Sequence, residues 1–379
     1  MRILIVIPNL TDPHTGTVGG AERNLVNIAN YLVSRGIPTG IFTIYKNEYY
    51  SYVDPAVERF CCEARIDHRS GRSSRHSWIK NSSSLYSALR RYILNWKPDI
   101  LLSFGFATDV LAFLEKMHFG KQLLWVTSER DYPEARSGMR QKCIGQMYRK
   151  ADLLVCQSRP VYEYYRQIRK KTILPNVTDF SRLPVPVQEQ LRDGQMEIVS
   201  AGRLVPQKNY ALLLRAFAAA RKRVKQPLCL SIYGAGEERA FLSRLAEKMD
   251  IAQYVRLPGY ATDLHERIKT ASIYVISSQY EGFSNAMTEA LYLGLPVIAT
   301  DHLPGVVKQT IDAESGIVVP SGDVQSLAGA IRTLVTDTGL RRKMRQHNSE
   351  RRIRDEENDR AGEMWLQTLQ EVYRQKRRR

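Results

Sequence analysis

Residues 278–301 read SQYEGFSNAMTEALYLGLPVIATD. They follow a short apolar run, residues 273–276, which has the length of a buried strand, and they end in a second such run, residues 297–300. Between the two runs, residues 285–292 have the pattern of a helix, and Ser284 is of a type that caps helix N-termini. A strand, a helix and a second strand in this order predict a βαβ unit with parallel strands.

The same alternation of apolar runs and helical patterns extends over most of the chain. Strands are expected in the first half at residues 3–7, 39–45, 99–104, 123–127, 152–157 and 172–174, and in the second half at residues 197–201, 228–233, 255–257, 273–276, 297–300 and 316–319. Helices of the second half are expected near residues 210–224, 238–249, 285–292 and 324–336. The pattern predicts an α/β protein with two facing Rossmann-like domains, each with a parallel sheet, and a cleft between them.

The length of the chain also favours two domains, because 379 residues exceed the size of one ordinary core. Residues 175–195 contain Pro184, Pro186 and Gly194 and show little apolar periodicity. We therefore expect a first domain over residues 1–180, a linker over 181–195 and a second domain over 196–355. A C-terminal helix and basic tail should occupy residues 356–379, in a region from residue 340 onward that is long enough for two helices.

The composition is that of a soluble globular protein, with 43% hydrophobic and 25% charged residues. No run of 18 apolar residues is present, and the apolar run before Pro8 is too short for the core of a signal peptide. The five cysteines are an odd number without the paired spacing of a zinc site, which favours reduced thiols in a cytoplasmic protein.

The net charge of +17 limits the partners to polyanions: nucleic acid, anionic lipid or a substrate that carries a diphosphate. Positive charge is concentrated in residues 65–80, around Trp78, and in residues 374–379. A solvated loop and a frayed tail are the simplest interpretations of these two segments.

Residues 281–289 have the chemistry of a site for a nucleotide-linked sugar. Gly282 lets the backbone approach a ligand closely, and the N-terminus of the following helix offers free N–H groups to a diphosphate. Glu281 stands level with a sugar on that diphosphate, and Glu289 lies about one turn further on, where a carboxylate can accept hydrogen bonds from a ribose diol. A capped surface helix with two solvated glutamates is the alternative.

The spacing Glu281-x7-Glu289 resembles the retaining GT-B glycosyltransferases of family 4. Four further segments resemble the same family in the same order along the chain: Gly19-Gly20-Ala21-Glu22, Gly202-Arg203 with Lys208, Gly234-Ala-Gly236, and Gly259-Tyr260.

This resemblance implies a retaining hexosyltransferase that uses a nucleotide-sugar, with UDP as the favoured nucleotide. It implies that Glu281, Arg203 and Lys208 are catalytic, and that the donor is bound by Gly19, Gly20, Gly202, Arg203, Lys208, Gly234, Gly259, Tyr260, Glu281, Gly282, Phe283, Ser284 and Glu289. The chain contains no Asp-x-Asp motif, so we expect no metal and no cofactor, with Arg203 and Lys208 neutralising the diphosphate.

The acceptor side is expected in the first domain, where residues 127–133 include Glu129 and Arg130. Many relatives have a histidine in this loop, but this chain has none between His118 and His265. The Ser-Glu-Arg-x-x-Pro form resembles bacterial transferases of surface or lipid-linked glycans, which implies that Glu129 or Arg130 touches the donor sugar or the acceptor. A purely structural role for this loop is the alternative.

These features together favour an enzyme that acts on a polyprenyl-diphosphate-linked glycan at the cytoplasmic face of an anionic inner membrane. A GT-B transferase with a soluble or protein acceptor is the nearest alternative. A nucleic-acid-binding protein is less favoured, because no binding motif is present and the two glutamates would have no role. An NAD enzyme would need a complete glycine fingerprint, and a non-hydrolysing sugar-nucleotide epimerase lacks the Glu-x7-Glu segment.

If the basic segment binds the membrane, reversal of its charge should release the protein. We expect replacement of Arg69, Arg72 and Arg75 by glutamate to abolish co-sedimentation with anionic vesicles, because each basic residue near such a surface contributes about 1 kcal/mol. Neutral vesicles serve as the control. Undiminished binding of the variant to anionic vesicles would refute the role of this segment.

Overall fold

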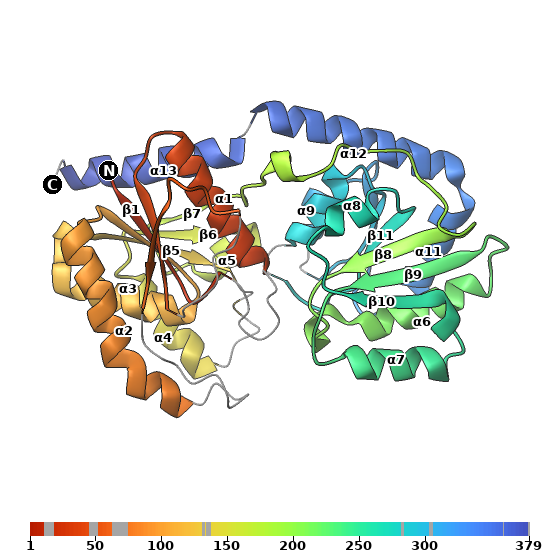
Figure 1. The fold of residues 1–379 in the computed structure, drawn as a ribbon, viewed down its shortest axis with the longest axis horizontal. Coiled ribbons are helices and arrows are strands. Elements are labelled where there is room, and N and C mark those ends of the chain that lie inside the picture. Colours follow the sequence, from red (N-terminus) through yellow and green to blue (C-terminus); the bar gives the residue numbers. More distant parts are fainter. Residues whose placement is uncertain are drawn as a thin grey trace. The chain divides into compact units, whose positions relative to one another are not determined.

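The computed structural model describes residues 1–10, 19–44, 52–62, 75–130, 133, 138–281, 284–302, 306–358 and 360–377. The chain divides into two compact units, one formed by Met1–Thr178 with Arg360–Arg379 and the other by Asp179–Asp359. Each unit contains one parallel sheet with helices on both faces (Figure 1). The predicted α/β class with two Rossmann-like domains is therefore confirmed, while the cleft stays a prediction.

The sheet of the first unit has seven strands in the order β3-β2-β1-β4-β5-β6-β7. Its strands are β1 (Ile3–Ile7), β2 (Thr39–Thr43), β3 (Glu58–Cys61), β4 (Ile100–Phe104), β5 (Leu124–Glu129), β6 (Leu153–Cys156) and β7 (Lys171–Ile173). From β1 the chain adds strands on one side and then, from β4, on the other. Such a reversal leaves a crevice beyond the carboxyl ends of the two central strands, where ligands of α/β proteins bind.

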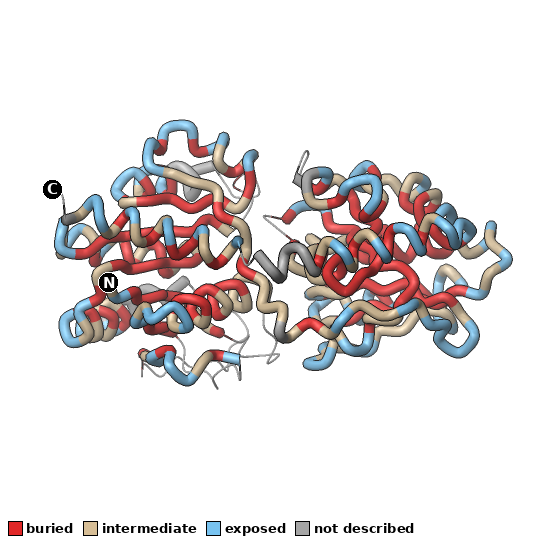
Figure 2. The backbone as a smooth tube through the Cα atoms, turned by 90° about the horizontal axis from the view of Figure 1, so that it is seen from above, coloured by how far each residue is buried: buried red, intermediate tan, exposed pale blue. Residues whose placement is uncertain are grey.

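Helices cover both faces of this sheet. They are α1 (Gly20–Ser34), α2 (Arg75–Trp96), α3 (Phe106–Phe119), α4 (Gly138–Tyr148), α5 (Arg159–Tyr164) and α13 (Arg360–Arg377), with a short 3-10 turn, η1 (Gly120–Gln122). Successive β1 residues alternate between two cores: Ile3 and Ile5 pack with α1 and α13, whereas Leu4 packs with α2, α3, α4 and α5. The strands β1, β2, β4, β5 and β6 are consequently buried on both sides, as the continuous red segments of Figure 2 show.

The last helix of the chain, α13, belongs to this first unit. Trp365 and Leu369 are completely buried in the same core as Leu25 of α1. The Trp365 indole donates a hydrogen bond to the backbone oxygen of Pro175 (2.9 Å), and Tyr31 of α1 donates to Glu363 (3.0 Å). The final helix therefore completes one face of the domain that the first residues of the chain begin.

The second unit has a six-stranded sheet in the order β10-β9-β8-β11-β12-β13. Its strands are β8 (Met196–Ala201), β9 (Leu228–Tyr233), β10 (Val255–Gly259), β11 (Ile273–Ile276), β12 (Val297–Thr300) and β13 (Gly316–Val319). Its helices are α6 (Tyr210–Arg221), α7 (Arg239–Lys248), α8 (Leu264–Ile268), α9 (Asn285–Tyr292), α10 (Val306–Thr310), α11 (Val324–Thr336) and α12 (Thr338–Asn358), with 3-10 turns η3 (Phe180–Arg182), η4 (Pro206–Lys208) and η5 (Ala252–Tyr254).

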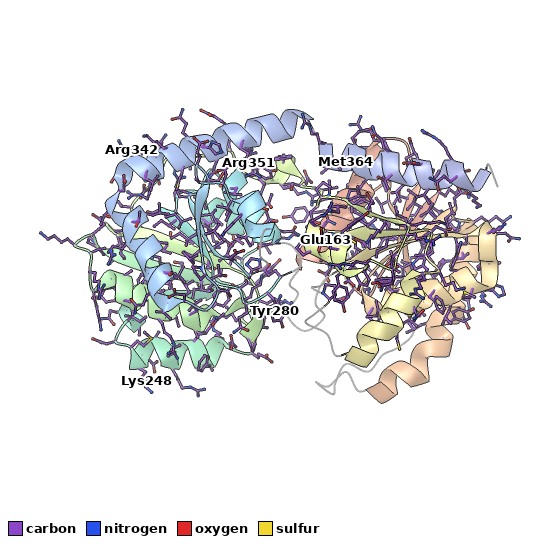
Figure 3. The ribbon with its side chains drawn as sticks, turned by 180° about the vertical axis from the view of Figure 1, so that it is seen from behind. Glu163, Lys248, Tyr280, Arg342, Arg351 and Met364 are labelled. Atoms are coloured by element: carbon purple, nitrogen blue, oxygen red, sulfur yellow. The ribbon has the colours of Figure 1, made fainter. Side chains whose placement is uncertain are left out.

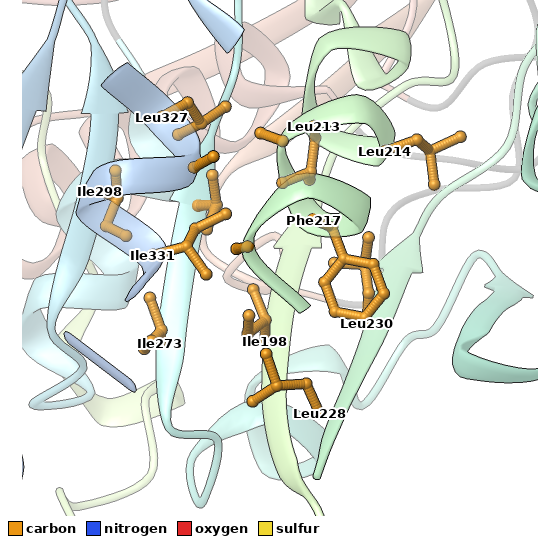
Figure 4. Close-up of a cluster of buried hydrophobic side chains, with 14 of the residues drawn as sticks. Ile198, Leu213, Leu214, Phe217, Leu228, Leu230, Ile273, Ile298, Leu327 and Ile331 are labelled. Atoms are coloured by element: carbon orange, nitrogen blue, oxygen red, sulfur yellow. The ribbon is translucent and has the colours of Figure 1, made fainter. Parts of the chain in front are cut away.

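Two apolar cores hold the second sheet between its helices. On one face, Phe217 of α6 and Ile331 of α11 pack on strand residues such as Ile198 and Leu230 (Figure 4). On the other face, α8, α9 and α10 cover strand residues including Val199. Complete burial of one such side chain contributes about 1.5–3 kcal/mol.

Residues 179–195 are counted with the second unit, although the sequence led us to expect a linker over 181–195. Buried arginines of α12 hold this segment. Arg352 donates hydrogen bonds to the backbone oxygens of Pro184 and Leu183, and Arg345 donates to Val187 O (2.9 Å). The boundary between the two units thus falls at residue 179, and the chain returns to the first unit at residue 360, which the sequence did not lead us to expect.

The twelve expected strands are all present, within two residues of the expected ends, and α12 and α13 confirm the two expected C-terminal helices. Strand β3 was not predicted. It is an edge strand of mixed polarity, half exposed, and so lacks the apolar run of the buried strands. Helix α2 begins at Arg75, inside the basic segment expected as a loop, whereas residues 65–74 lie outside the described residues. None of the described helices is long and apolar enough to cross a membrane.

A network of buried polar groups lies under the carboxyl end of β5. Asp109 of α3 accepts hydrogen bonds from Ser103 (2.6 Å), Thr127 (2.9 Å) and Tyr148 (2.9 Å). Burial raises the pKa of Asp109 to about 7, and the nearby Glu129 adds to the effect, while the three hydroxyl hydrogen bonds oppose it. Asp109 therefore retains a proton in the folded protein at pH values where the unfolded chain has lost it.

This raised pKa predicts a pH-dependent stability. The contribution of Asp109 is fully present below its unfolded pKa of about 4 and is lost as the pH rises through about 7. We expect Asp109→Asn, which has no proton to lose, to show a smaller fall in Tm between pH 5 and pH 8 than the wild type. Glu247→Gln, at an exposed site of α7, is the control. If the Tm of Asp109→Asn falls as much between pH 5 and pH 8 as that of the wild type, the raised pKa of Asp109 is contradicted.

Candidate functional site

Two loops meet at the point in the second sheet where the strand order reverses. Lys208 ends η4, which follows β8, and residues 277–281 follow the neighbouring strand β11. The Gln279 N–H donates to Gln207 O (2.9 Å), the Gln207 amide donates to Tyr280 O (2.9 Å), and the Ser277 hydroxyl donates to Lys208 O (2.9 Å). Tyr280, labelled in Figure 3, is itself exposed. These bonds fasten the two loops together.

Lys208 and Glu281 form an ion pair across these loops. The Lys208 Nζ lies 2.8 Å from the Glu281 Oε1, and the Ser278 hydroxyl donates to the same oxygen. The Glu281 side chain is 7% exposed and that of Lys208 is 18% exposed. Both border a small recess, which is also lined by Ser200, Ala201, Tyr210, Ile276, Ser277, Ser278, Ser284 and Ala286. Two of the three residues predicted to be catalytic are therefore in contact.

The charge of Glu281 is set by opposing effects. Burial is the largest single effect and by itself would raise the pKa of the carboxyl group. The charge of Lys208, the charge that His302 carries at the acidic pH where Glu281 titrates, and hydrogen bonds from Lys208 and Ser278 together outweigh burial and hold the pKa of Glu281 below its ordinary value. Glu281 is therefore a carboxylate at neutral pH.

His302 is a residue of this site that the sequence did not reveal. It lies just after β12, the neighbour of β11, and its Nδ1 is 2.9 Å from the backbone oxygen of Thr300. Burial lowers the pKa of His302 below its ordinary value, although Glu281 acts in the opposite direction. The ring is thus neutral at pH 7. A signal was available, because His302 follows a buried strand at the same sheet edge as Glu281.

Glycines join the ends of the strands beside this site. The Gly202 N–H donates to Tyr233 O (3.0 Å), and the Gly234 N–H donates to Gly259 O (2.8 Å). Gly234 has a φ of 137°, and a Cβ there would lie 1.9 Å from the backbone oxygen of Gly202. Only glycine fits this position. Close packing of the strand ends explains Gly234, and contact of these glycines with a nucleotide stays a prediction.

The other predicted donor residues lie around the same edge of the second unit. Arg203 directly follows Gly202 and is exposed, and Tyr260 follows β10 with 43% of its surface exposed. Ser284 occupies the N-cap position of α9, as predicted, but its hydroxyl makes no capping hydrogen bond within the described residues. Gly282 and Phe283 lie outside the described residues.

Glu289 lies one turn into α9 and contacts a histidine of α8. The His265 Nε2 is 3.0 Å from the Glu289 Oε2. The sequence pointed to Glu289 but not to this partner, which is 24 residues earlier in the chain.

In the first unit, Gly19 is the N-cap residue of α1 and Gly20 is its first residue. They lie where the connection from β1 enters α1, and β1 is one of the two strands at the reversal of the sheet order. A Cβ on Gly19 would lie 2.3 Å from the Glu22 carboxylate, so a larger residue would have to displace that side chain. The expected contact of these glycines with the donor remains a prediction.

Glu129 ends β5 and is buried, and Arg130, which directly follows it, is partly buried. The Glu129 carboxylate accepts a hydrogen bond from Tyr165 (2.7 Å). Arg130 donates to Asn176 (2.7 Å), and its guanidinium lies 4.5 Å from the centre of the Phe104 ring. Burial lowers the pKa of Arg130 to about 9. These contacts favour the structural interpretation of both side chains, and contact with a sugar stays a prediction.

No group of three or more His, Cys, Asp or Glu side chains is arranged to hold a metal ion in the part of the chain that the structure describes. All five cysteines are free thiols. Lys208 lines the recess, and Arg203 lies in the same connection after β8.

The Lys208–Glu281 pair predicts how removal of the lysine changes stability. In the wild type the lowered pKa of Glu281 contributes stability that is present above its unfolded pKa and lost as the pH falls. Without Lys208, burial should raise this pKa, and stability should then be lost as the pH rises. We expect the Tm of Lys208→Met to fall further below wild type at pH 8 than at pH 5. The double variant with Glu281→Gln should lose this difference. If Lys208→Met lowers the Tm by the same amount at pH 5 and pH 8, the proposed effect of Lys208 on the pKa of Glu281 is contradicted.

Comparisons with known proteins cover both units. Residues 18–182 match the family model described as Glycosyltransferase Family 4, and residues 184–351 match the one described as Glycosyl transferases group 1. A lipopolysaccharide core biosynthesis glycosyltransferase of Rhizobium meliloti (strain 1021) is 26% identical over 371 residues, which cover 95% of this chain and 98% of that protein. The N-acetylgalactosamine-N,N'-diacetylbacillosaminyl-diphospho-undecaprenol 4-alpha-N-acetylgalactosaminyltransferase of Campylobacter jejuni is 27% identical over 338 residues, covering 86% and 89%.

Solved structures share the fold. Sucrose-phosphate synthase from Thermosynechococcus elongatus has a TM-score of 0.81 at 17% identity, covering 98% of this chain and 99% of that one. Anabaena HepE in complex with UDP-glucose has a TM-score of 0.77 at 16% identity, covering 98% and 100%. Two adjoining family matches and one shared two-domain fold lead to a single conclusion: the chain belongs to the family 4 glycosyltransferases of the GT-B fold.

Proposed function

We propose that this glycosyltransferase moves a hexose or N-acetylhexosamine from a UDP-sugar to a lipid-linked glycan, with retention of the anomeric configuration and without a metal ion. The observation that carries the donor half is the Lys208–Glu281 pair at the reversal point of the second sheet. A cation for the diphosphate and a carboxylate for the sugar are thereby side by side.

Charge on the leaving group is the main electrostatic demand of this reaction. As the sugar–phosphate bond breaks, negative charge grows on the departing diphosphate, and fixed cations can stabilise it in place of a metal. Lys208 and the exposed Arg203 would do so, each contact contributing about 1.5–3 kcal/mol. Glu281 would hold the sugar hydroxyls beside the positive charge that develops on the ring. A departing phosphate oxygen would take the proton of the acceptor hydroxyl.

The Lys208–Glu281 ion pair has a consequence for donor binding. Because Lys208 is already paired with Glu281, a diphosphate must draw the ammonium group away from the carboxylate or share it. The sugar hydroxyls would then replace the lysine as hydrogen-bond donors to Glu281. This exchange ties binding of the diphosphate to recognition of the sugar.

The proposed acceptor rests on the relatives and on charge. The Campylobacter jejuni relative is named for a diphospho-undecaprenol acceptor, and a Rhizobium meliloti relative for lipopolysaccharide core biosynthesis. The net charge of +17 suits a surface of anionic lipid. We place the enzyme at the cytoplasmic face of the inner membrane as a peripheral protein, with no nucleic-acid partner.

A thermal-shift panel of UDP, GDP, ADP and NAD in EDTA tests the donor half. A nucleotide at about 100 times its Kd stabilises the folded protein by about 2.7 kcal/mol. We expect UDP to raise the Tm, and we expect Glu289→Ala to lose that response because the ribose contact is gone. If only GDP or only ADP raises the Tm, that nucleotide replaces UDP in the proposal. No response to any nucleotide, with or without Mg2+, would remove the support for the proposed donor site.

A further inference from the structure

Helix α8 directs one histidine at α9. The His265 Nε2 lies 3.0 Å from the Glu289 Oε2, and the two side chains are 21% and 16% exposed. The other charged residues of this segment pair with one another along the chain: Asp263 with Arg267 (2.7 Å), and Glu266 with Lys269 (2.5 Å). His265 therefore adds a polar contact with α9 to the apolar packing that Ile268 of α8 makes with that helix.

We propose that His265 is a positioning residue that holds Glu289 in the orientation required to bind the ribose of the donor nucleotide, and so sets how strongly the enzyme selects ribonucleotides. This inference rests on the proposed function, because it takes Glu289 as the ribose ligand. It adds a residue from a different helix, one that no motif in the sequence indicates.

The chemistry of the pair suits this role. A glutamate side chain has three rotatable bonds, and fixing them on ligand binding costs conformational entropy. A hydrogen bond from the imidazole N–H to one carboxylate oxygen restricts these bonds in the free protein, so that less entropy is lost when the nucleotide binds. A carboxylate has about four acceptor positions, so one bond from His265 is compatible with further bonds from a diol.

The surroundings place Glu289 close to the strand ends. Burial, the nearby Tyr210 and the charge of Glu289, in that order, raise the pKa of Tyr274. The hydroxyl of Tyr274 accepts a hydrogen bond from the Ala201 N–H (3.1 Å), and Ala201 immediately precedes Gly202. Glu289 is thus near the glycine-lined edge at which the nucleotide is expected.

The test compares the affinities of UDP and 2′-deoxy-UDP by isothermal titration calorimetry. The wild type should prefer UDP, and His265→Leu should reduce that preference about tenfold, because a hydrogen bond to a charged group is worth at least that factor. His265→Gln keeps an N–H donor and should retain most of the preference. His347→Leu is the matched control: His347 also contacts carboxylates, those of Asp312 (3.5 Å) and Glu314 (3.4 Å), but lies in α12.

If His265 has only a structural role, His265→Leu should lower the affinities for UDP and 2′-deoxy-UDP by the same factor. Their ratio would then be unchanged, which would overturn the inference. An unchanged ratio in a folded His265→Leu protein that still binds UDP would do the same. If that variant does not fold, His265→Asn, whose amide is too short to reach Glu289, replaces it with the same expected loss. Failure of the wild type to bind UDP would instead overturn the proposed function, and this inference with it.

Discussion

The contact between Lys208 and Glu281 is the interaction around which the candidate site of the second unit is organised. Its two residues come from the connections after β8 and β11, the strands between which the order of the sheet reverses. A buried carboxylate without a cation would be costly, so the lysine, the Ser278 hydroxyl and the ordered backbone of both loops are needed together. The site is therefore a set of mutually dependent contacts, and its charge is balanced before any substrate binds.

Elsewhere in the second unit, charge is buried in a different way. Arginines of α12 point into the unit and donate to backbone oxygens: Arg341 to Val335 (3.0 Å), Arg345 to Val187, and Arg352 to Leu183. A guanidinium group has five N–H donors, which lets one side chain satisfy several carbonyl groups that no helix or strand pairs. An irregular segment can then cross the protein surface without unpaired backbone groups. The high arginine content is thus partly structural and is not only a surface for polyanions.

Much of this architecture was predictable because it depends on local pattern. The apolar runs predicted the buried strands. The helix predicted over residues 285–292 is observed with the same bounds. Strand β3 was missed because an edge strand needs only one buried face and therefore leaves a weak pattern. Within the site, Glu281 and Lys208 were predictable from their place after strands. His302 also follows a strand at this edge and was overlooked. His265 offered no such signal, because its partner is 24 residues away in sequence and only the folded chain brings the two together.

Helix α13 has a consequence for how the protein is made. It is synthesised after the whole of the second unit, yet Trp365 and Leu369 fill the core that Leu25 and Val26 of α1 begin. During synthesis, the part of this face that α13 covers must remain exposed until α13 has been made, because Tyr31 of α1 and its partner Glu363 are 332 positions apart in the sequence. The second unit, which is continuous in sequence from Asp179 to Asp359, can complete its own core first. The domain that begins the chain is thus the last to be finished, and its exposed apolar face is the natural point for chaperone binding or misassembly in a nascent or shortened chain.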